Sequence, residues 1–404
     1  MRVENWDGET PLTNESPNAA YPWPFFAAVA ATGLLFFSFH GLFSVLPLYI
    51  IDLGGASVDT GIATWVFALA ALLVRPPAGL LADRWGRKPA LVLGALLFGG
   101  APLLYGLVTN VSGLLLVRAI HGMGLALFST SYQAFVADWL PVARYGEGFG
   151  IANAASTVTM TVAPLFGEVL ESRAGWQSLF IVLGGIGAAG LAITLTLPRR
   201  KYQNGKGDRD DAATTGSGLR RLLDRRVVRL GALGMMVLGV PFGAFITFLP
   251  LLAEARAIAG TGWAFMGYAL ASSLAQPAMG RAIDRWGARR TVLVGITLIS
   301  LSAVGLAYAA NVTMLLTLAV LFGVGHGAAR VSFDTRVQRN VDTDSRGSAS
   351  AILYTAFDLM VGLGSWGLGA LAGAMGYRVM YGAVAAIVLV GLAIGAMMGV
   401  KRKA

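Results

Sequence analysis

Five ionisable side chains lie deep inside long apolar stretches of this sequence: His40, Arg118, His121, His326 and Asp358. A helix rises about 1.5 Å per residue, and counting from the ends of each stretch places all five near the middle of a membrane. Ionisable groups are costly at that depth and usually serve function. Their types predict proton binding and contact with a charged solute.

Proton binding is assigned first to Asp358, and then to His121 and His326. A carboxylate in a low dielectric near an arginine can exchange a proton or a partner. The chain has only three histidines, and imidazole changes its charge in the physiological pH range. Two alternatives stay open: a lone membrane histidine can hydrogen-bond between helices without titrating, and Asp358 can pair with Arg75 in a fixed bridge.

Arg118 is expected to contact the substrate, together with His40. A guanidinium is a permanent cation, which can hold an anionic substrate or a carboxylate. An unpaired buried guanidinium is expensive, and this favours a functional reading of Arg118 over a purely structural one.

The composition is that of an integral membrane protein. Of 404 residues, 56% are hydrophobic and 13% are charged, whereas soluble proteins carry roughly 25% charged residues. The chain has no cysteine, which excludes disulfides and thiolate metal sites. The net charge of +10 comes from residues in short connections between apolar runs, so membrane topology explains it better than nucleic-acid binding does.

Twelve apolar segments are long enough to span a membrane. They cover 24–51, 60–82, 89–109, 112–137, 147–170 and 176–197, and then 229–252, 260–282, 290–310, 312–334, 347–371 and 376–400. The sequence therefore predicts an all-α membrane protein with twelve transmembrane helices in two six-helix halves. The predicted domains are an N-terminal tail (1–23), a first bundle (24–197), a linker (198–228), a second bundle (229–400) and a C-terminal tail (401–404).

The linker ends in LRRLLDRRVVRL at 219–230. Leucines spaced among arginines predict an amphipathic helix on the membrane surface. A short basic extension of the seventh spanning helix explains the same pattern.

A charged block repeats at half the chain length. GLLADRWGRKPAL at 79–91 returns as GRAIDRWGARRTV at 280–292, an offset of 201 residues. Such self-similarity indicates two homologous halves. The leading glycine of each block permits close approach of another helix. Asp83 and Asp284 end apolar segments, where a carboxylate can pair with arginines or face a helix N-terminus.

Basic residues alternate along the connections. Arg and Lys occur in both copies of the repeated block, at Arg144, in the central linker, at Arg339 and Arg346, and at 401–403. These connections alternate with others that are nearly free of both residue types. Basic short loops mark the cytoplasmic side. Both termini are therefore expected in the cytoplasm, in keeping with an even number of helices.

The repeated block resembles the loop signature of the major facilitator superfamily, Gly-x-x-x-Asp-Arg-x-Gly-Arg-Lys. RAIHGMGLA at 118–126 resembles the family's Arg-x-x-Gln-Gly-x-Gly-x-Ala, with His121 in the Gln place. The pairs Gly175-Trp176 and Gly376-Tyr377, again 201 residues apart, resemble the turns that open helices six and twelve. The resemblance covers about residues 24–400.

Helix five bears on the drug/proton antiporter branch, which carries a Gly-Pro-x-x-Gly-Gly element. This chain keeps Pro164 and Gly167 but has Ala163 and Glu168 in place of the first and last glycines, which weakens the antiporter signal. Pro164 and Gly167 are expected at a helix interface, as is Arg75. The run AFDLMVGLGSWGLG around Asp358 resembles bacterial exporters named sugar-efflux or drug-resistance permeases.

The resemblance implies a central cavity lined by helices one, four, seven and ten. On these helices the substrate contacts are expected to be His40, Arg118, Tyr132 and Phe245. The aromatic residues suit a partly apolar pocket, and equally suit lipid-facing or packed positions.

The resemblance also implies a cytoplasmic latch between helix ends, which stabilises the outward-facing state. Its expected residues are Gly79, Asp83, Arg84, Gly86, Arg87 and Asp138 in the first half, and Gly280, Asp284 and Arg285 in the second.

The predicted function is secondary active transport of a small organic solute by alternating access, outward and with proton counterflow. The alternatives are an uptake or facilitative carrier and a transport-dead receptor or scaffold. A membrane enzyme is disfavoured because the histidines stand singly and no His-Glu-x-x-His pair exists. We expect no enzyme activity, no metal and no cofactor besides protons. The chain is expected to be a monomer in the inner (plasma) membrane, with a small-molecule substrate, the lipid bilayer and no nucleic acid as partners.

Overall fold

The computed structural model describes residues 20–140, 145–199, 223–341 and 346–397. All regular secondary structure in these ranges is α-helical. The helices are α1 (Trp23–His40), α2 (Leu46–Asp52), α3 (Ser57–Trp85), α4 (Arg87–Tyr105), α5 (Val111–Trp139), α6 (Tyr145–Thr196), α8 (Arg226–Ala255), α9 (Thr261–Trp286), α10 (Ala288–Leu306), α11 (Val312–Gln338) and α12 (Arg346–Met397). The predicted tails and most of the predicted linker lie outside the described residues.

The twelve predicted spans are present within the described ranges. Nine of the described helices are long and apolar enough to cross a membrane. Two of the nine, α6 and α12, each hold two spans, which meet at Gly175 (φ 73°) and Gly376 (φ 80°). Positive φ is strained for residues that carry a Cβ, so glycine permits both turns. The twelfth span is α9, which has 26 residues and charged side chains in its last turns.

The first predicted helix, 24–51, is not continuous. α1 ends at His40, turns follow, and α2 starts at Leu46 with Pro47 in its first turn. Proline has no N–H to continue a preceding helix, and it suits the first turn of a new one. The break leaves the Ser44 hydroxyl free to donate a 2.6 Å hydrogen bond to the carbonyl of Pro164. The prediction of one helix over 24–51 is therefore wrong, and the break places His40 at a helix end.

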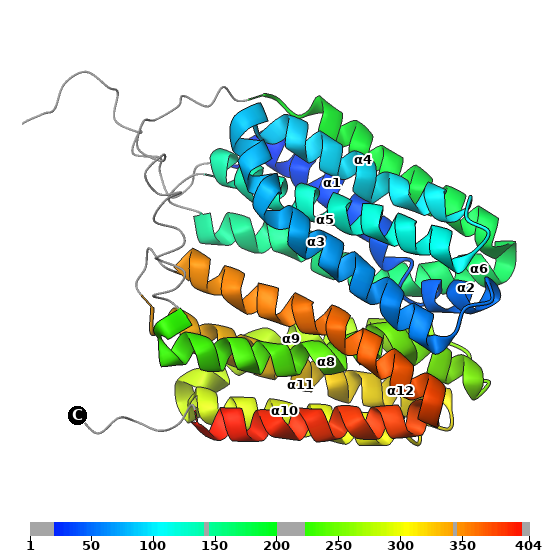
Figure 1. The fold of residues 1–404 in the computed structure, drawn as a ribbon. Helices are drawn as coiled ribbons and strands as arrows, with labels where there is room; N and C mark the ends of the chain where they lie inside the picture. The colour runs from blue at the N-terminus through cyan, green and yellow to red at the C-terminus, as the bar shows by residue number, and fades with distance from the viewer. Residues whose placement is uncertain (1–19, 141–144, 200–222, 342–345, 398–404) are drawn as a thin grey trace, which may run out of the picture.

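The helices form two bundles, α1–α6 and α8–α12 (Figure 1). Two helix pairs make most of the contacts between the bundles: α3 packs on α12, and α6 packs on α9. We call the end of the molecule where α3 and α9 finish the basic end, and the end where they begin the opposite end. The helices of the two bundles come together at the opposite end (Figure 1).

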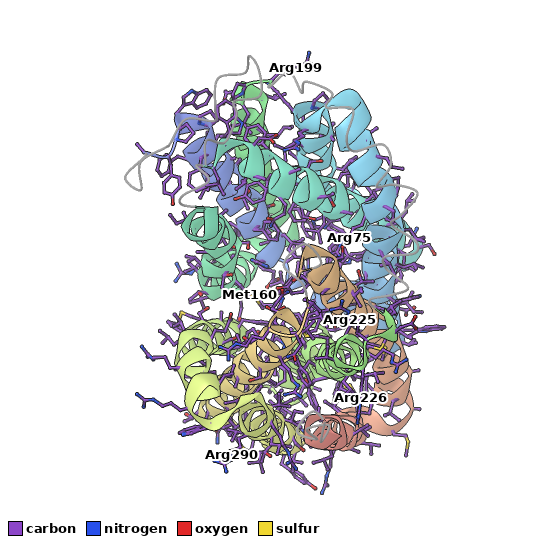
Figure 2. The ribbon with its side chains drawn as sticks, turned by 90° about the vertical axis from the view of Figure 1, so that its left-hand side faces the viewer. Arg75, Met160, Arg199, Arg225, Arg226 and Arg290 are labelled. Carbon is purple, nitrogen blue, oxygen red and sulfur yellow. The ribbon has the colours of Figure 1, made fainter. Side chains whose placement is uncertain are left out.

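Figure 2 looks onto the basic end, where Arg199, Arg225, Arg226 and Arg290 are labelled. Arg199 follows α6, and the two consecutive arginines precede and start α8. The connection between the halves therefore begins and ends at the basic end. Of the basic run at 219–230, residues 226–230 belong to α8, and Arg225 in extended conformation separates them from a short helical stretch at 223–224. Both predictions for this run, a surface helix and an extension of the seventh spanning helix, stay open.

Small residues allow the helices within a bundle to approach closely. A Cβ on Gly167 of α6 would collide with the carbonyl of Gly41, just after α1. Gly99 of α4 and Gly187 of α6 also approach closely, because a Cβ on either would collide with the backbone of the other. These contacts fix α1 and α4 against α6 and so position the residues that face the second bundle.

Candidate functional site

A cavity of about 340 Å³ lies between the two bundles. Its size falls within the range of small-molecule sites, roughly 300–1,000 Å³. Side chains of both halves line it, from α1, α2, α3, α5 and α6 on one side and from α8, α11 and α12 on the other. Most of the lining is apolar or aromatic, with few hydrogen-bonding groups. The cavity extends from Thr60, near the opposite end, to Arg75 and Asp358, further toward the basic end.

Arg75 on α3 and Asp358 on α12 join the two halves at the wall of this cavity. The guanidinium Nη2 lies 2.7 Å from the carboxylate Oδ2, and the side chains are 31% and 36% exposed. The bridge that the sequence left open as an alternative is therefore present. Both groups line the cavity, so the carboxylate is accessible from the cavity as well as paired.

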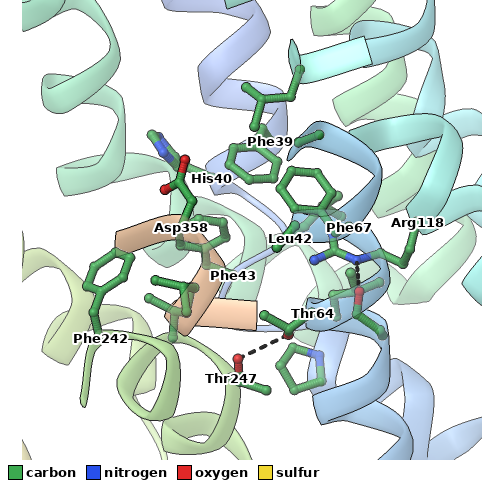
Figure 3. A pocket seen from close by; sticks show the side chains of 18 of the residues that line it. Phe39, His40, Leu42, Phe43, Thr64, Phe67, Arg118, Phe242, Thr247 and Asp358 are labelled. Carbon is green, nitrogen blue, oxygen red and sulfur yellow. Dashed lines mark hydrogen bonds between the residues drawn. The ribbon is translucent and has the colours of Figure 1, made fainter. Parts of the chain in front are cut away.

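Arg118 on α5 lines the cavity close to Phe67 (Figure 3). Its Nε donates a 3.3 Å hydrogen bond to the carbonyl of Ala63, and its guanidinium carbon lies 4.4 Å from the centre of the Phe67 ring. The residue is only 8% exposed. Among the described residues, no carboxylate oxygen lies within 4.0 Å of the Arg118 guanidinium, the distance required for an ion pair. Arg118 is thus held by a backbone carbonyl and an aromatic face.

Arg330 on α11 is a second cavity cation, and the sequence did not single it out for substrate contact. Its guanidinium lies 5.3 Å from the ring centre of Tyr354 and 5.1 Å from that of Phe357. Asp334 follows one turn later, but it forms no ion pair with Arg330 among the described residues. Arg330 and Asp334 interact electrostatically without an ion-pair contact. The signal for Arg330 was its position well inside a spanning helix, where an arginine is costly.

His40 is the one histidine of the three that lines the cavity. Its Nδ1 lies 2.9 Å from the Thr159 hydroxyl oxygen, and that hydroxyl donates its own hydrogen to the carbonyl of Ser156. The hydroxyl oxygen can therefore only accept from His40, which places a proton on Nδ1. His40 joins α1 to α6 at the cavity wall.

His121 and His326 are buried behind the cavity wall, at 0% and 1% exposure. His121 lies 3.2 Å from the hydroxyl of Tyr105, and His326 lies 3.0 Å from that of Tyr268. In both rings the Nε2 atom is buried without a hydrogen-bond partner among the described residues. Neither side chain lines the cavity in this conformation, so the structure does not bring them together with Asp358.

Tyr132 and Phe245, expected to contact substrate, lie in the packed cores of their halves. The Tyr132 hydroxyl donates a 3.2 Å hydrogen bond to the carbonyl of Ala152. The Phe245 ring stacks on Phe322 at 4.8 Å. Neither residue is among those that line the cavity. The aromatic lining comes instead from other residues, Phe36, Phe39, Phe43, Phe67, Phe242 and Phe357.

Hydroxyl side chains join the halves at the cavity wall and closer to the opposite end. Thr64 and Thr247 lie 3.1 Å apart, from α3 and α8 (Figure 3). Nearer the opposite end, the hydroxyls of Ser57 and Tyr377 lie 2.8 Å apart. A Cβ on Gly61 would collide with the backbone of Ser365, so α3 and α12 touch there directly.

Glu168 makes the most extensive polar contact between the halves at the opposite end. Its carboxylate accepts hydrogen bonds from the Gly260 amide (2.9 Å), the Thr261 hydroxyl (2.8 Å) and the Gly262 amide. These groups form the N-terminus of α9, where free amides and the helix dipole favour a negative charge. In the sequence, Glu168 stands out only because it replaces the last glycine of the antiporter element. Its partners are mainly backbone amides, which side-chain patterns do not reveal.

The interface expected at Pro164 and Gly167 is present. The Pro164 carbonyl accepts the Ser44 hydrogen bond, and Gly167 touches the backbone of Gly41. Both contacts hold α6 against the α1–α2 break, one turn from Glu168. They therefore position the carboxylate that reaches α9.

The described part of the predicted latch is a contact within the first half. Arg87, at the start of α4, forms an ion pair with Asp138 at the end of α5, and it also donates to the carbonyl of Ala134. Gly86 has φ 91° between α3 and α4. Gly79 has open space where a Cβ would lie, so the close helix approach expected there is absent in this conformation.

In the second copy, Arg285 is exposed, and Gly287 has φ 81°, matching the turn at Gly86. The side chains of Asp83, Arg84 and Asp284, and the surroundings of Gly280, lie outside the described part of the structure.

Comparison with known proteins agrees with this architecture. The family model of the Major Facilitator Superfamily matches residues 28–260 and 231–403. An uncharacterised MFS-type transporter, MJ1560 of Methanocaldococcus jannaschii, is 24% identical over 342 residues, which are 83% of this chain and 88% of that protein. The quinolone resistance protein NorA of Staphylococcus aureus is 26% identical over 175 residues, 43% of this chain and 45% of that protein.

Solved structures share the fold. A bacterial homologue of the human lysosomal transporter Spinster, inward-facing and unoccupied, superposes with a TM-score of 0.78 at 17% identity, over 93% of this chain and 96% of that chain. The nucleoside transporter NupG superposes with a TM-score of 0.75 at 16% identity, over 94% and 100%. Given the family match across both halves, the chain belongs to the Major Facilitator Superfamily and is a multi-pass membrane transporter.

Proposed function

We propose that this transporter exports a small organic solute across the cytoplasmic membrane by alternating access, in exchange for protons. The observation that carries the proposal is the Arg75–Asp358 pair, which joins the two halves at the wall of the central cavity. A transporter driven by a proton gradient needs a group whose charge differs between states of the cycle. A carboxylate that faces the cavity and also bridges the moving halves meets that need.

Alternating access follows from the positions of the contacts between the halves. Glu168, Ser57 and Tyr377 hold the halves together at the opposite end. The basic end is cytoplasmic by the rule that Lys and Arg gather on that side. The described conformation then corresponds to a transporter closed toward the outside. Opening toward the outside requires these hydrogen bonds to break and the basic end to close.

Proton coupling is assigned to Asp358. A protonated carboxyl cannot form the ion pair with Arg75, so proton binding and pairing exclude each other. Because both side chains are about one-third exposed to the cavity, the pair is screened and contributes only about 1 kcal/mol or less. A pair of that strength can form and break during a transport cycle. His40 is the second titratable group of the cavity, and His121 and His326 stand behind it.

Export is favoured over uptake by the similarity to a quinolone resistance protein and by the sequence around Asp358. The same geometry would serve a proton-coupled or facilitative uptake carrier. We further propose a monomer with both termini in the cytoplasm. In sealed cells, an impermeant thiol reagent should label Thr109→Cys at the opposite end and not Arg290→Cys at the basic end. The reverse pattern would contradict this orientation.

A flux measurement tests the proposal. The purified full-length protein is placed in proteoliposomes with an acidic interior, and uptake of nalidixate, a quinolone carboxylate, is followed. Nalidixate should accumulate only while the pH gradient lasts, whereas protein-free liposomes exclude this weak acid. Flux that only equilibrates nalidixate, with or without the pH gradient, favours a facilitative carrier. No flux at all contradicts the proposal for this solute class.

The matched variants are Asp358→Asn and Glu254→Gln. Glu254 is an exposed carboxylate outside the cavity lining. We expect Asp358→Asn to lose accumulation while it still equilibrates nalidixate down its own gradient, and Glu254→Gln to behave like the wild type. Full proton-driven accumulation by Asp358→Asn would leave the carboxylate a structural role only.

A further inference from the structure

The cavity contains more positive than negative charge. Three guanidiniums line it, those of Arg75, Arg118 and Arg330, and one carboxylate, that of Asp358. Arginine remains protonated in proteins. The single carboxylate is already paired with Arg75 at 2.7 Å, so two cations face the cavity without an ion-pair contact to a carboxylate among the described residues.

Aromatic rings hold these two cations in place of carboxylates. Phe67 packs on Arg118, and Tyr354 and Phe357 pack near Arg330. A guanidinium on a ring face directs its N–H groups within its own plane, where a planar anion can accept two of them. In Arg118 the Nε–H is bonded to the Ala63 carbonyl and one further N–H is shared with the Tyr105 hydroxyl, so an anion would bind the remaining Nη–H groups. Unpaired cations at membrane depth are expensive, and a bound anion would offset that cost.

The two cations lie at different depths. By helix rise, Arg118 lies about 10 Å from the start of α5, and Arg330 lies about 27 Å from the start of α11. Both helices start at the opposite end. Arg118 therefore sits toward the closed end of the cavity, and Arg330 toward the basic end, along the path that a solute would take from the cytoplasm.

The remaining lining selects the body of the solute. Phe67 lies next to Arg118 in the close view, Phe43 lies near Asp358, and Phe242 lines the cavity from the second half (Figure 3). A sugar-like neutral solute would need many hydrogen-bond partners, and this lining offers few. Stacking and apolar contact suit an aromatic or branched hydrocarbon body.

We propose that the cavity binds an amphipathic organic anion, a carboxylate or sulfonate on an aromatic or branched apolar body, with its acidic group on Arg118. The inference rests on the proposed transport function for its biological meaning, but not for its test. Arg330 is the first contact on entry from the basic end. Asp358 remains available for the coupling proton because Arg118, not Arg75, takes the anion.

Binding to the full-length protein in detergent tests the inference without any gradient. The probes are 4-phenylbutyrate, 4-phenylbutanol and 4-phenylbutylamine, which share one apolar body and carry a negative, zero or positive charge. The Kd of 4-phenylbutyrate should be at least about tenfold below the Kd of the amine, as expected for one charge-assisted hydrogen-bonded pair. The same order should appear in ligand-induced rises of Tm.

Arg118→Gln should weaken 4-phenylbutyrate binding at least about tenfold and leave 4-phenylbutanol binding unchanged, by the same reasoning. Arg290→Gln is the matched control, because Arg290 is exposed at the basic end and does not line the cavity. Should Arg118→Gln fail to fold, Arg118→Lys keeps the charge and should keep the preference for the carboxylate. The wild-type comparison of the three probes requires no variant.

The inference is overturned if the amine binds as tightly as the carboxylate, if 4-phenylbutyrate does not bind, or if Arg118→Gln leaves its affinity unchanged. Its failure is separable from that of the proposed function. Gradient-driven transport of cationic solutes would keep the function and reject the anion. Selective anion binding without gradient-driven flux would do the reverse.

Discussion

Arg75 and Asp358 form a 2.7 Å ion pair that ties α3 of the first half to α12 of the second. The pair lies at the cavity wall, so the same two side chains belong both to the interface between the halves and to the solute site. Exposed pairs contribute about 1 kcal/mol or less to stability. The pair therefore contributes little to stability, and its importance for transport comes from its position between the halves.

A double-mutant cycle on Arg75→Gln and Asp358→Asn separates a structural bridge from a coupling device. Unfolding in detergent should give an interaction energy of about 1 kcal/mol or less, because both side chains are about one-third exposed. Proton-driven accumulation should nevertheless be lost in Asp358→Asn. An interaction energy of several kcal/mol with accumulation intact would identify a structural bridge.

Glu168→Ala should loosen the closed opposite end. The carboxylate accepts three hydrogen bonds at the N-terminus of α9, and bonds to a charged group contribute about 1.5–3 kcal/mol each. A loss of 1.4 kcal/mol alone shifts the equilibrium tenfold toward opening. The measurement is the rate at which an impermeant reagent labels Thr60→Cys from outside, which should rise at least about tenfold.

Glu171→Ala is the control for Glu168→Ala. Glu171 lies one turn further along α6 and is a similar carboxylate near the same end, and no hydrogen bond joins it to α9 among the described residues. Equal labelling rates in the two variants would remove Glu168 as a clamp between the halves.

Gly167→Ala should destabilise the first half by about 1–3 kcal/mol, because an added Cβ would overlap the carbonyl of Gly41. Gly185→Ala on the same helix α6 is the control, since nothing lies within 4 Å of a Cβ there. Thermal unfolding in detergent should lower the Tm of the first variant only. Matching Tm values would contradict the close packing of α6 against the end of α1.

Arg256→Ala should destabilise the second half. The guanidinium donates to the carbonyls of Leu306 (3.1 Å), Ala307 (2.7 Å) and Ala309 (2.6 Å), which terminate α10. Burial lowers the pKa of Arg256 below its usual value, yet an arginine stays charged over the physiological range. The loss should be about 2 kcal/mol or more, by the strength of hydrogen bonds to charged groups. An unchanged Tm would contradict this role.

The sequence predicted those features that depend on local backbone requirements or on depth. Gly175 and Gly376 mark the turns within α6 and α12 because positive φ favours glycine. The Arg75–Asp358 bridge was one open alternative, because the family resemblance implies that their two helices are neighbours. The break after His40 was missed because Pro47 lies in a continuously apolar run, and periodicity there gives no signal.

The sequence could not predict which way the side chains of an apolar helix point. Tyr132 and Phe245 lie on helices of the cavity but face the packed cores, and the pattern of an all-apolar helix does not distinguish the two faces. The contact of Glu168 with the second half was not predicted for another reason: two of its partners are backbone amides of α9, which leave no mark in the sequence. The sequence did not single out Arg330, whose aromatic neighbours Tyr354 and Phe357 come from a helix of the same half that only the fold brings next to it.

The central claim, that protonation of Asp358 moves the halves, is tested most directly by distances between spin labels at several pH values. The chain has no cysteine, so labels can be placed on Thr109→Cys and Thr313→Cys at the opposite end, and on Leu195→Cys and Asn340→Cys at the basic end. No solute is required.

Between neutral and acidic pH, the wild-type distances at the two ends should change in opposite directions, as one end opens and the other closes. Asp358→Asn should give one distance distribution at every pH, while Glu254→Gln should respond like the wild type. A pH response in Asp358→Asn equal to that of the wild type would contradict the account.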